Sequence, residues 1–198
     1  MHRIRPFRPG DEPALAEICL RTADAGADGT GSFADDDLWA EVFVLPYVAR
    51  HPDLAFVVED EGGTPHGYVV GTSDTDQFEE WFRTQWWPRF AARWPKPERE
   101  QSRQDGTLLY AYGRGPGTEQ HAARYPAHLH IDLLPDLQGQ GWGRRLIDRL
   151  RDELRQRDVT GVHLVASAHN TGALAFYERL GFEALPSHPG SQAFGMAL

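Results

Sequence analysis

The segment that most constrains this chain is a glycine-dense turn between an apolar strand and an arginine-rich helix. Residues 131–143 read Ile-Asp-Leu-Leu-Pro-Asp-Leu-Gln-Gly-Gln-Gly-Trp-Gly, and residues 143–157 carry six arginines against three acidic residues. Such a turn exposes several backbone N–H groups at the positive end of a helix dipole, where phosphate and pyrophosphate groups bind. Glycines are needed because side chains would keep phosphate oxygens away from the backbone. The sequence therefore predicts a phosphate-binding turn, with a plain tight turn as the structural alternative.

Two other phosphate motifs do not fit this turn. A P-loop ends in Gly-Lys-Ser/Thr, whereas this chain has Gly143, Arg144 and Arg145. A dinucleotide-binding fingerprint needs a glycine three residues after Gly141, where Arg144 stands. A nucleotide-dependent enzyme would have to show affinity for ATP or NAD over other phosphate ligands, and the sequence favours neither.

Composition restricts the class of protein further. The chain has 198 residues, of which 40% are hydrophobic and 25% charged, which is typical of one soluble globular domain over 1–198. No apolar run is long enough to span a membrane, and the first residues lack the apolar stretch of a secretory leader. The single cysteine, Cys19, fits a reducing compartment. We therefore expect a cytoplasmic protein with no membrane partner, either a monomer or a homodimer.

The net charge of −9 is unevenly distributed along the chain. Residues 1–105 carry twenty acidic and eleven basic side chains, and residues 106–198 carry nine of each. One interpretation is that the basic helix receives an anionic cofactor while the acidic part faces a cationic acceptor. The alternative is that the charge serves solubility alone. No broad basic face is visible, so nucleic-acid binding is not expected.

Hydrophobic periodicity and turn residues predict a mixed, mostly antiparallel α/β (α+β) sheet flanked by helices. Expected strands cover 2–7, 54–59, 68–72, 128–134 and 162–167, and a terminal hairpin over 182–185 and 193–198 could close the sheet. Expected helices begin at Asp11 and cover 36–50, 143–157 and 171–180, the last one ending at Gly181.

Residues 74–127 form a tryptophan-rich insert in this alternation. Five aromatic residues recur every four positions, which predicts a helix that is kinked or broken at Pro88. They are Phe78, Phe82, Trp86, Phe90 and Trp94. This stripe either packs on the sheet or walls an acceptor pocket in part. The glycines and prolines over 95–117 predict a long irregular connection, of the kind that often forms lids or binding loops.

A second cluster follows the next strand at a fixed distance, as Asn170, Ala173, Tyr177, Gly181 and Phe182. Together with the glycine turn, this cluster resembles the GCN5-related N-acetyltransferase (GNAT) superfamily. The resemblance implies the GNAT fold, in which strands four and five splay apart. It also implies an N-acetyltransferase that moves an acetyl group from acetyl-CoA directly to a primary amine in a ternary complex. The amine would belong to a small molecule or a peptide.

The resemblance also implies roles for individual residues. The residues that would bind the pyrophosphate are Gln138, Gly139, Gln140, Gly141, Trp142, Gly143 and Arg144. The backbone of Leu133 would pair with the pantetheine arm, and Asn170 and Phe176 would border the cofactor. Tyr177 would be the general acid for the departing thiolate. A phenol suits that task because its pKa near 10 keeps it protonated at neutral pH.

A narrower resemblance covers nearly the whole chain. The segments 58–61, 67–72 and 125–132 are similar to the C-terminal acetyltransferase-like domain of O-GlcNAcase and its free-standing bacterial relatives. The animal domain has lost the glycine turn and is regarded as a pseudo-acetyltransferase, whereas this chain keeps the turn. The alternative to an enzyme is therefore a CoA-binding or non-catalytic module that recognises a peptide or protein partner.

Strand alternation places His128, His130 and Asp132 on one face of the strand that precedes the turn. A general base could strip the proton from an ammonium acceptor there. Asp132 is our first choice because it lies nearest the glycine turn, and His130 is the second because its reference pKa suits neutral pH. The alternative is a structural polar cluster. The spacing of His128 and His130 alone is too weak to indicate a metal, so no metal is expected.

Overall fold

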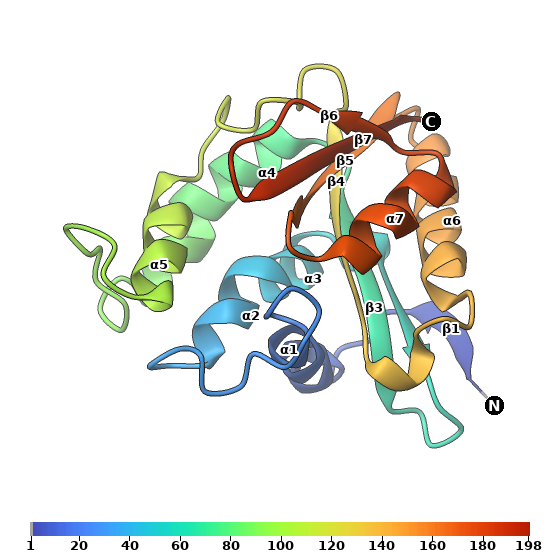
Figure 1. Cartoon of the computed structure of the whole chain (residues 1–198), viewed down its shortest axis with the longest axis horizontal. Helices are drawn as coiled ribbons and strands as arrows, with labels where there is room; N and C mark the ends of the chain where they lie inside the picture. The colour runs from blue at the N-terminus through green and yellow to red at the C-terminus, as the bar shows by residue number, and fades with distance from the viewer. Residues whose placement is uncertain (1) are drawn as a thin grey trace.

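A seven-stranded mixed sheet forms the centre of the computed structural model, which describes residues 2–198 (Figure 1). The strands lie in the order β1-β2-β3-β4-β5-β7-β6. Their bounds are Arg3–Pro6, Ala55–Glu59, Pro65–Thr72, Ala127–Leu133, Gly161–Ser167, Glu183–Leu185 and Ser191–Ala197 for β1 to β7. All neighbouring pairs are antiparallel except β4 and β5. The expected mixed, mostly antiparallel sheet is confirmed.

The parallel strands β4 and β5 pair over a very short length. Ala127 is opposite Val162 and His128 is opposite His163, and no later residues of the two strands are paired. β4 keeps its antiparallel partner β3 as far as Leu133, so only its other edge becomes free. The two strands therefore splay apart after His128, as expected.

Helices cover both faces of the sheet (Figure 1). On one face lie α1 (Glu12–Arg21), α2 (Asp37–Phe43) and α3 (Leu45–Arg50), whose apolar side chains pack on Tyr68 and Val70 of β3. On the other lie α6 (Trp142–Arg155) and α7 (Thr171–Leu180). No helix within residues 2–198 is long and apolar enough to cross a membrane.

The helix expected over 36–50 is in fact two helices, α2 and α3, and this corrects the sequence prediction. Val44 separates them with a φ of −133°, and Pro46 stands in the first turn of α3. A proline has no N–H to donate to the carbonyl four residues earlier, which here is that of Val42. The guanidinium of Arg114 donates to this carbonyl at 2.9 Å instead. The break between α2 and α3 thus leaves the Val42 carbonyl free to accept a hydrogen bond from Arg114 of the insert.

The insert is more regular than expected. It contains α4 (Thr75–Trp81), a π turn over Phe82–Trp86 and a 3-10 turn over Trp87–Phe90. The α-helix therefore ends at Trp81, before the break expected at Pro88, and Pro88 lies in the first turn of the 3-10 segment. It also contains α5 (Arg103–Gly113), in the segment expected to be irregular, and that expectation was wrong. Ser102 caps α5 by accepting a hydrogen bond from the Asp105 amide. The glycine after this cap weakened the helical pattern in the sequence.

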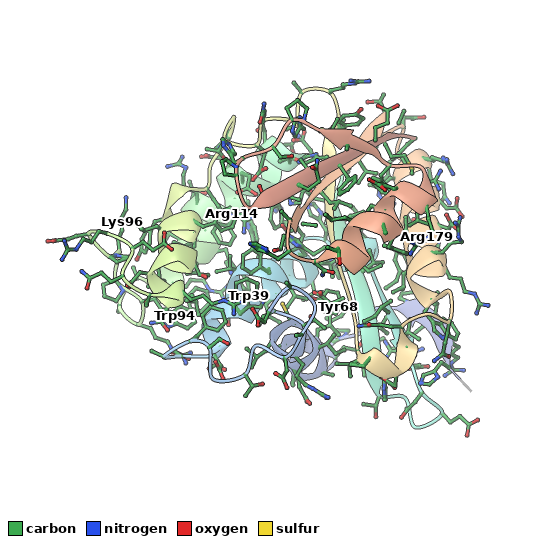
Figure 2. The ribbon with its side chains drawn as sticks, in the orientation of Figure 1. Trp39, Tyr68, Trp94, Lys96, Arg114 and Arg179 are labelled. Carbon is green, nitrogen blue, oxygen red and sulfur yellow. The ribbon has the colours of Figure 1, made fainter. Side chains whose placement is uncertain are left out.

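Most of the aromatic stripe packs against α2 and α5 rather than on the sheet. Phe82, Trp86, Trp87 and Trp94 form a separate core with apolar side chains of α2 and α5. Trp94 and Lys96 lie at the opposite end of the molecule from Arg179 of α7 (Figure 2). Only the first member, Phe78, joins the core between α1–α3 and the sheet.

Candidate functional site

Two cavities meet along β4. The first, here called the glycine-turn pocket, measures about 580 Å³ and is lined by β4 residues 131–133, by the turn and by α7. The second, here called the histidine pocket, measures about 570 Å³ and is lined by β4 residues 128–130, by β5 and by the insert. His130 and Ile131 are consecutive residues, so the two pockets meet where the strands splay.

The glycines of the turn serve two different purposes. Gly139 and Gly141 have φ values of +72° and +81°, in the left-handed region that favours glycine, and a Cβ on either would meet nothing within 4 Å. At Gly143 a Cβ would lie 2.9 Å from the ring of Phe176. The first two glycines therefore keep the backbone open toward the pocket, and the third allows α6 to approach α7.

The turn leaves amide groups free to bind an anion. The side chain of Gln138 donates to the Leu133 carbonyl at 2.9 Å, which fastens the turn to the end of β4. Trp142 and Arg144 belong to the first turn of α6, whose N–H groups have no intrahelical acceptor. The first bond across the start of α6 runs from the Arg145 amide to the Gly141 carbonyl, at 3.2 Å. The arrangement is a suitable seat for a phosphate.

The predicted cofactor residues gather around the glycine-turn pocket. Nine of the ten line it, namely Leu133, Gln138, Gly139, Gly141, Trp142, Gly143, Arg144, Asn170 and Phe176. Gln140 does not, because its side-chain amide donates to the Asp136 carbonyl within the turn. Thr22, Ala25 and Gly26 complete the wall, and no feature of the sequence indicated them. Whether these residues bind a cofactor stays a prediction.

Tyr177 lines the same pocket from α7. Its side chain is buried, with 7% of the residue exposed, and packs against the rings of Phe182 and Phe194. Burial, and then the negative charge of Asp132, raises the pKa of Tyr177. The hydroxyl group makes no hydrogen bond to any residue within 2–198. It is therefore a protonated donor without a partner inside the pocket.

Asp132 lies on β4 at the floor of the glycine-turn pocket. Its register partner on β3 is Tyr68, whose hydroxyl group donates a hydrogen bond to Oδ2 of Asp132. Burial raises the pKa of the Asp132 carboxyl, although hydrogen bonds from Tyr68 and Thr22 oppose the shift. A raised pKa makes this carboxylate a stronger base than an ordinary aspartate.

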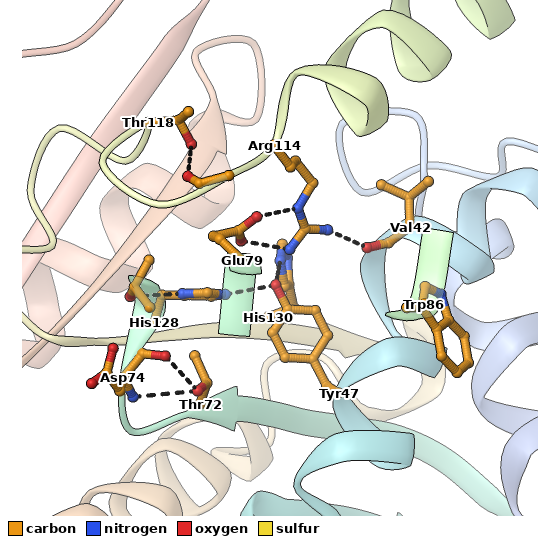
Figure 3. A network of polar contacts seen from close by, with 12 residues as sticks. Val42, Tyr47, Thr72, Asp74, Glu79, Trp86, Arg114, Thr118, His128 and His130 are labelled. Atoms are coloured by element: carbon orange, nitrogen blue, oxygen red, sulfur yellow. Dashed lines mark hydrogen bonds and ion pairs between the residues drawn. The ribbon is translucent and has the colours of Figure 1, made fainter. Parts of the chain in front are cut away.

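A chain of hydrogen bonds fixes the tautomers of both histidines on this face of β4 (Figure 3). Thr75 donates its only hydroxyl proton to the Pro126 carbonyl at 2.7 Å, so Nδ1 of His128 must donate to Thr75 at 2.9 Å. Nε2 of His128 then accepts from the Tyr47 hydroxyl at 2.7 Å. Nε2 of His130 donates to the same Tyr47 oxygen at 3.1 Å. The lone pair of His130 is therefore on Nδ1.

Both histidines are neutral at physiological pH. Burial, and then the charges of Arg114 and His163, lowers the pKa of His130 to about 3. Burial also lowers the pKa of His128 well below its ordinary value. His130 is a candidate base by sequence because its reference pKa suits neutral pH, but that reference value does not apply in this environment. His130 instead offers a fixed hydrogen-bond acceptor at the wall of the histidine pocket.

The lowered pKa of His130 predicts an acid-sensitive contribution to stability. His130 binds a proton in the unfolded chain below about pH 6.5 but not in the folded chain until about pH 3. The free energy of unfolding should therefore decrease as the pH is lowered through that window, by up to about 1.4 kcal/mol per pH unit for this residue. We expect His130→Gln to reduce the slope by this amount in denaturant titrations between pH 6 and pH 4. Identical slopes for the two proteins would contradict the prediction.

A buried ion pair beside the two histidines also lines the histidine pocket (Figure 3). Arg114 donates two hydrogen bonds to the carboxylate of Glu79, at 2.6 and 2.8 Å, and both side chains are 2% exposed. The remaining terminal nitrogen of Arg114 donates to the Val42 carbonyl, and the guanidinium lies 3.8 Å from the ring centre of Phe82. Each of the three guanidinium nitrogens of Arg114 therefore has a partner, and the pair adds no net charge to the pocket.

Within residues 2–198, none of the five stripe residues lines either pocket. The insert instead contributes Glu79, Tyr110, Arg114 and residues 118–121 to the histidine pocket. Elsewhere on the surface, His2, His66 and Asp136 bring possible ligand atoms within 4.8 Å of one another. They are far apart in the sequence, so residue spacing gave no signal for a possible metal site there.

Comparison with known proteins identifies the family. The model of the Acetyltransferase (GNAT) family matches residues 23–182, and the chain belongs to this family. The solved structure described as SsHAT is 40% identical, with a TM-score of 0.93 over 99% of this chain and 98% of that chain. The PaiA N-acetyltransferase from Thermoplasma acidophilum, solved in complex with coenzyme A, is 11% identical, with a TM-score of 0.62 over 100% of this chain and 99% of that chain. The expected GNAT fold is confirmed.

The narrower resemblance is also confirmed. Protein O-GlcNAcase of Rattus norvegicus is 25% identical over 184 residues, which is 91% of this chain. The match covers 20% of that protein, so this chain spans about a fifth of its relative's length. The likeness is therefore to one region of O-GlcNAcase and not to the whole protein.

Proposed function

We propose that this protein is an acetyl-CoA-dependent N-acetyltransferase that moves an acetyl group directly to a primary amine. The observation that supports this most is the meeting of two pockets on β4, one with an open glycine turn and one with neutral hydrogen-bond acceptors. Membership of the GNAT family, and a relative in fold that was solved with coenzyme A, favour acetyl-CoA as the ligand of the first pocket.

The residues of the glycine-turn pocket fit this cosubstrate. Backbone amides around Gly141 would bind the pyrophosphate, with Arg144 and Arg179 adding positive charge at the rim. Leu133, Asn170 and Phe176 line the rest of the cavity. Acetyl-CoA supplies a thioester, whose carbonyl carbon is the electrophile.

The amine would enter through the histidine pocket. Its nitrogen forms a bond to the thioester carbon while the carbon–sulfur bond breaks. Asp132 takes the proton that the amine loses, and it is the preferred general base because its pKa is raised. Nδ1 of His130 accepts a hydrogen bond from the amine and orients it. Tyr177 donates its proton to the departing thiolate. A phenol can do this because it is still protonated at pH 7.

Two measurements test this proposal. Calorimetric titration with acetyl-CoA should show binding, and mass spectrometry of an amine panel incubated with acetyl-CoA should show acetylated products. Asp132→Asn should bind acetyl-CoA normally and lose about a hundredfold in turnover, since a positioned base typically contributes that much. Binding without any turnover would support the alternative, a CoA-binding module with a peptide or protein partner. An absence of binding at millimolar acetyl-CoA would refute the enzyme and the CoA-binding module, and would leave the non-catalytic module that recognises a peptide or protein partner.

A further inference from the structure

Three charged side chains line the histidine pocket, and two of them neutralise each other. Glu79 and Arg114 form the buried pair described above, and the third is Glu119. His128, His130 and His163 add no charge, because burial lowers the pKa of each one. His121 and His188 also line the pocket, and Nε2 of His121 donates to the Pro186 carbonyl at 2.9 Å. Among the carboxylates of this lining, Glu119 is therefore the one without an ion-pair partner.

The carboxylate of Glu119 has no hydrogen-bonded or ion-paired partner within residues 2–198, although the nearby Arg114 and His121 act to lower its pKa. It makes no ion pair and accepts no hydrogen bond there, although the residue is partly buried in the loop that follows α5. Burial, and then the nearby Glu79, raises the pKa of Glu119. A partly buried carboxylate without a partner is costly, and a bound cation would remove that cost.

An apolar wall accompanies this carboxylate. The rings of Phe43 and Tyr110 are stacked, with centres 5.7 Å apart and planes 13° from parallel. Tyr110 is 42% exposed and Val165 is 51% exposed, and within residues 2–198 these two are the large apolar side chains left at the surface. Both line the histidine pocket. Such a surface can cover the methylene groups of an alkyl chain and can hold an ammonium group against a ring face.

We propose that Glu119 binds a second positive charge of the acceptor, so that the preferred substrates carry another cationic group besides the reacting amine. This inference rests on the proposed function and specifies its substrate class. The reacting amine lies at β4 beside His130, the alkyl chain follows the apolar wall, and the distal cation pairs with Glu119. Acceptors with a distal carboxylate are disfavoured, because the charge of Glu119 repels them and the charge of Arg114 is already neutralised by Glu79.

The test compares three acceptors of equal chain length: pentylamine, cadaverine and the corresponding aminopentanoate. For the unmodified protein, kcat/KM should be highest for cadaverine, lower for pentylamine and lowest for the aminopentanoate. Glu119→Gln should lower kcat/KM for cadaverine roughly ten- to a hundredfold, the usual contribution of a hydrogen bond to a charged group. Pentylamine should react at the same rate with both proteins. A matched pair of lysine dipeptides, ending in arginine or glutamate, shows whether a peptide can supply the second charge.

Glu98→Gln is the matched control, because it removes the same charge from an exposed position outside both pockets. Equal loss in the two variants, or an unchanged preference for cadaverine in Glu119→Gln, would overturn the proposal. Should no amine be acetylated, calorimetric binding of cadaverine to the three proteins decides the question independently. Weaker binding to Glu119→Gln alone would then support the subsite even though the proposed activity had failed.

Discussion

Tyr177→Phe should lower kcat by about ten- to a thousandfold while the affinity for coenzyme A stays the same. The substitution removes one oxygen atom, and that atom makes no hydrogen bond to any residue within 2–198. The ring keeps its packing against Phe182 and Phe194, so the fold should not change. The loss is confined to proton donation to the leaving thiolate. Steady-state kinetics together with calorimetric titration of coenzyme A would measure the two quantities separately.

Tyr125→Phe is the control for this experiment. Tyr125 is also buried, at 3% exposure, but it lines neither pocket. We expect the control variant to retain full activity. Equal turnover for Tyr177→Phe and the unmodified protein would show that Tyr177 takes no part in the mechanism. The departing thiolate would then take its proton from solvent.

Gly141→Val should raise the Kd for coenzyme A by about a hundredfold, which corresponds to roughly 2.8 kcal/mol. A β-branched residue strongly disfavours a φ of +81°, so the turn must rearrange and its amides must move. The new side chain would also project into the open space that the phosphate needs. Equilibrium titration with coenzyme A measures this loss.

Backbone strain by itself would also lower stability, and Gly31→Val separates the two effects. Gly31 has a φ of +75° and open space around it, but it lies outside the glycine-turn pocket. Both variants should lose about 1–2 kcal/mol in free energy of unfolding. Only the variant at 141 should lose coenzyme A affinity. Equal affinities in the two variants would show that the turn does not bind the diphosphate.

The sequence predicted the parts of the site that are local in the chain. The glycine turn, the start of α6 and the cluster on α7 each lie within about a dozen residues, so motif spacing was enough to find them. Strand alternation correctly placed His128, His130 and Asp132 on one face, because the side-chain direction in a strand depends only on position.

The wall of the histidine pocket could not be predicted in the same way. Tyr47, Glu79, Tyr110 and Arg114 come from separate helices and one loop, and they meet only because α2 ends before Pro46 and α5 packs against it. No periodicity links them. The pKa of His130 likewise depends on burial and on Arg114, which its neighbours in sequence do not reveal.

The early parting of β4 and β5 has a consequence for the behaviour of the protein in solution. Beyond His128 each strand has an edge whose peptide groups face a gap inside the sheet. Unpaired strand edges are templates on which other chains can add and aggregate. A ligand that occupies the gap would cover these edges and stabilise the native state by mass action. Long-term storage of this protein should therefore benefit from saturating coenzyme, beyond any effect on its catalytic rate.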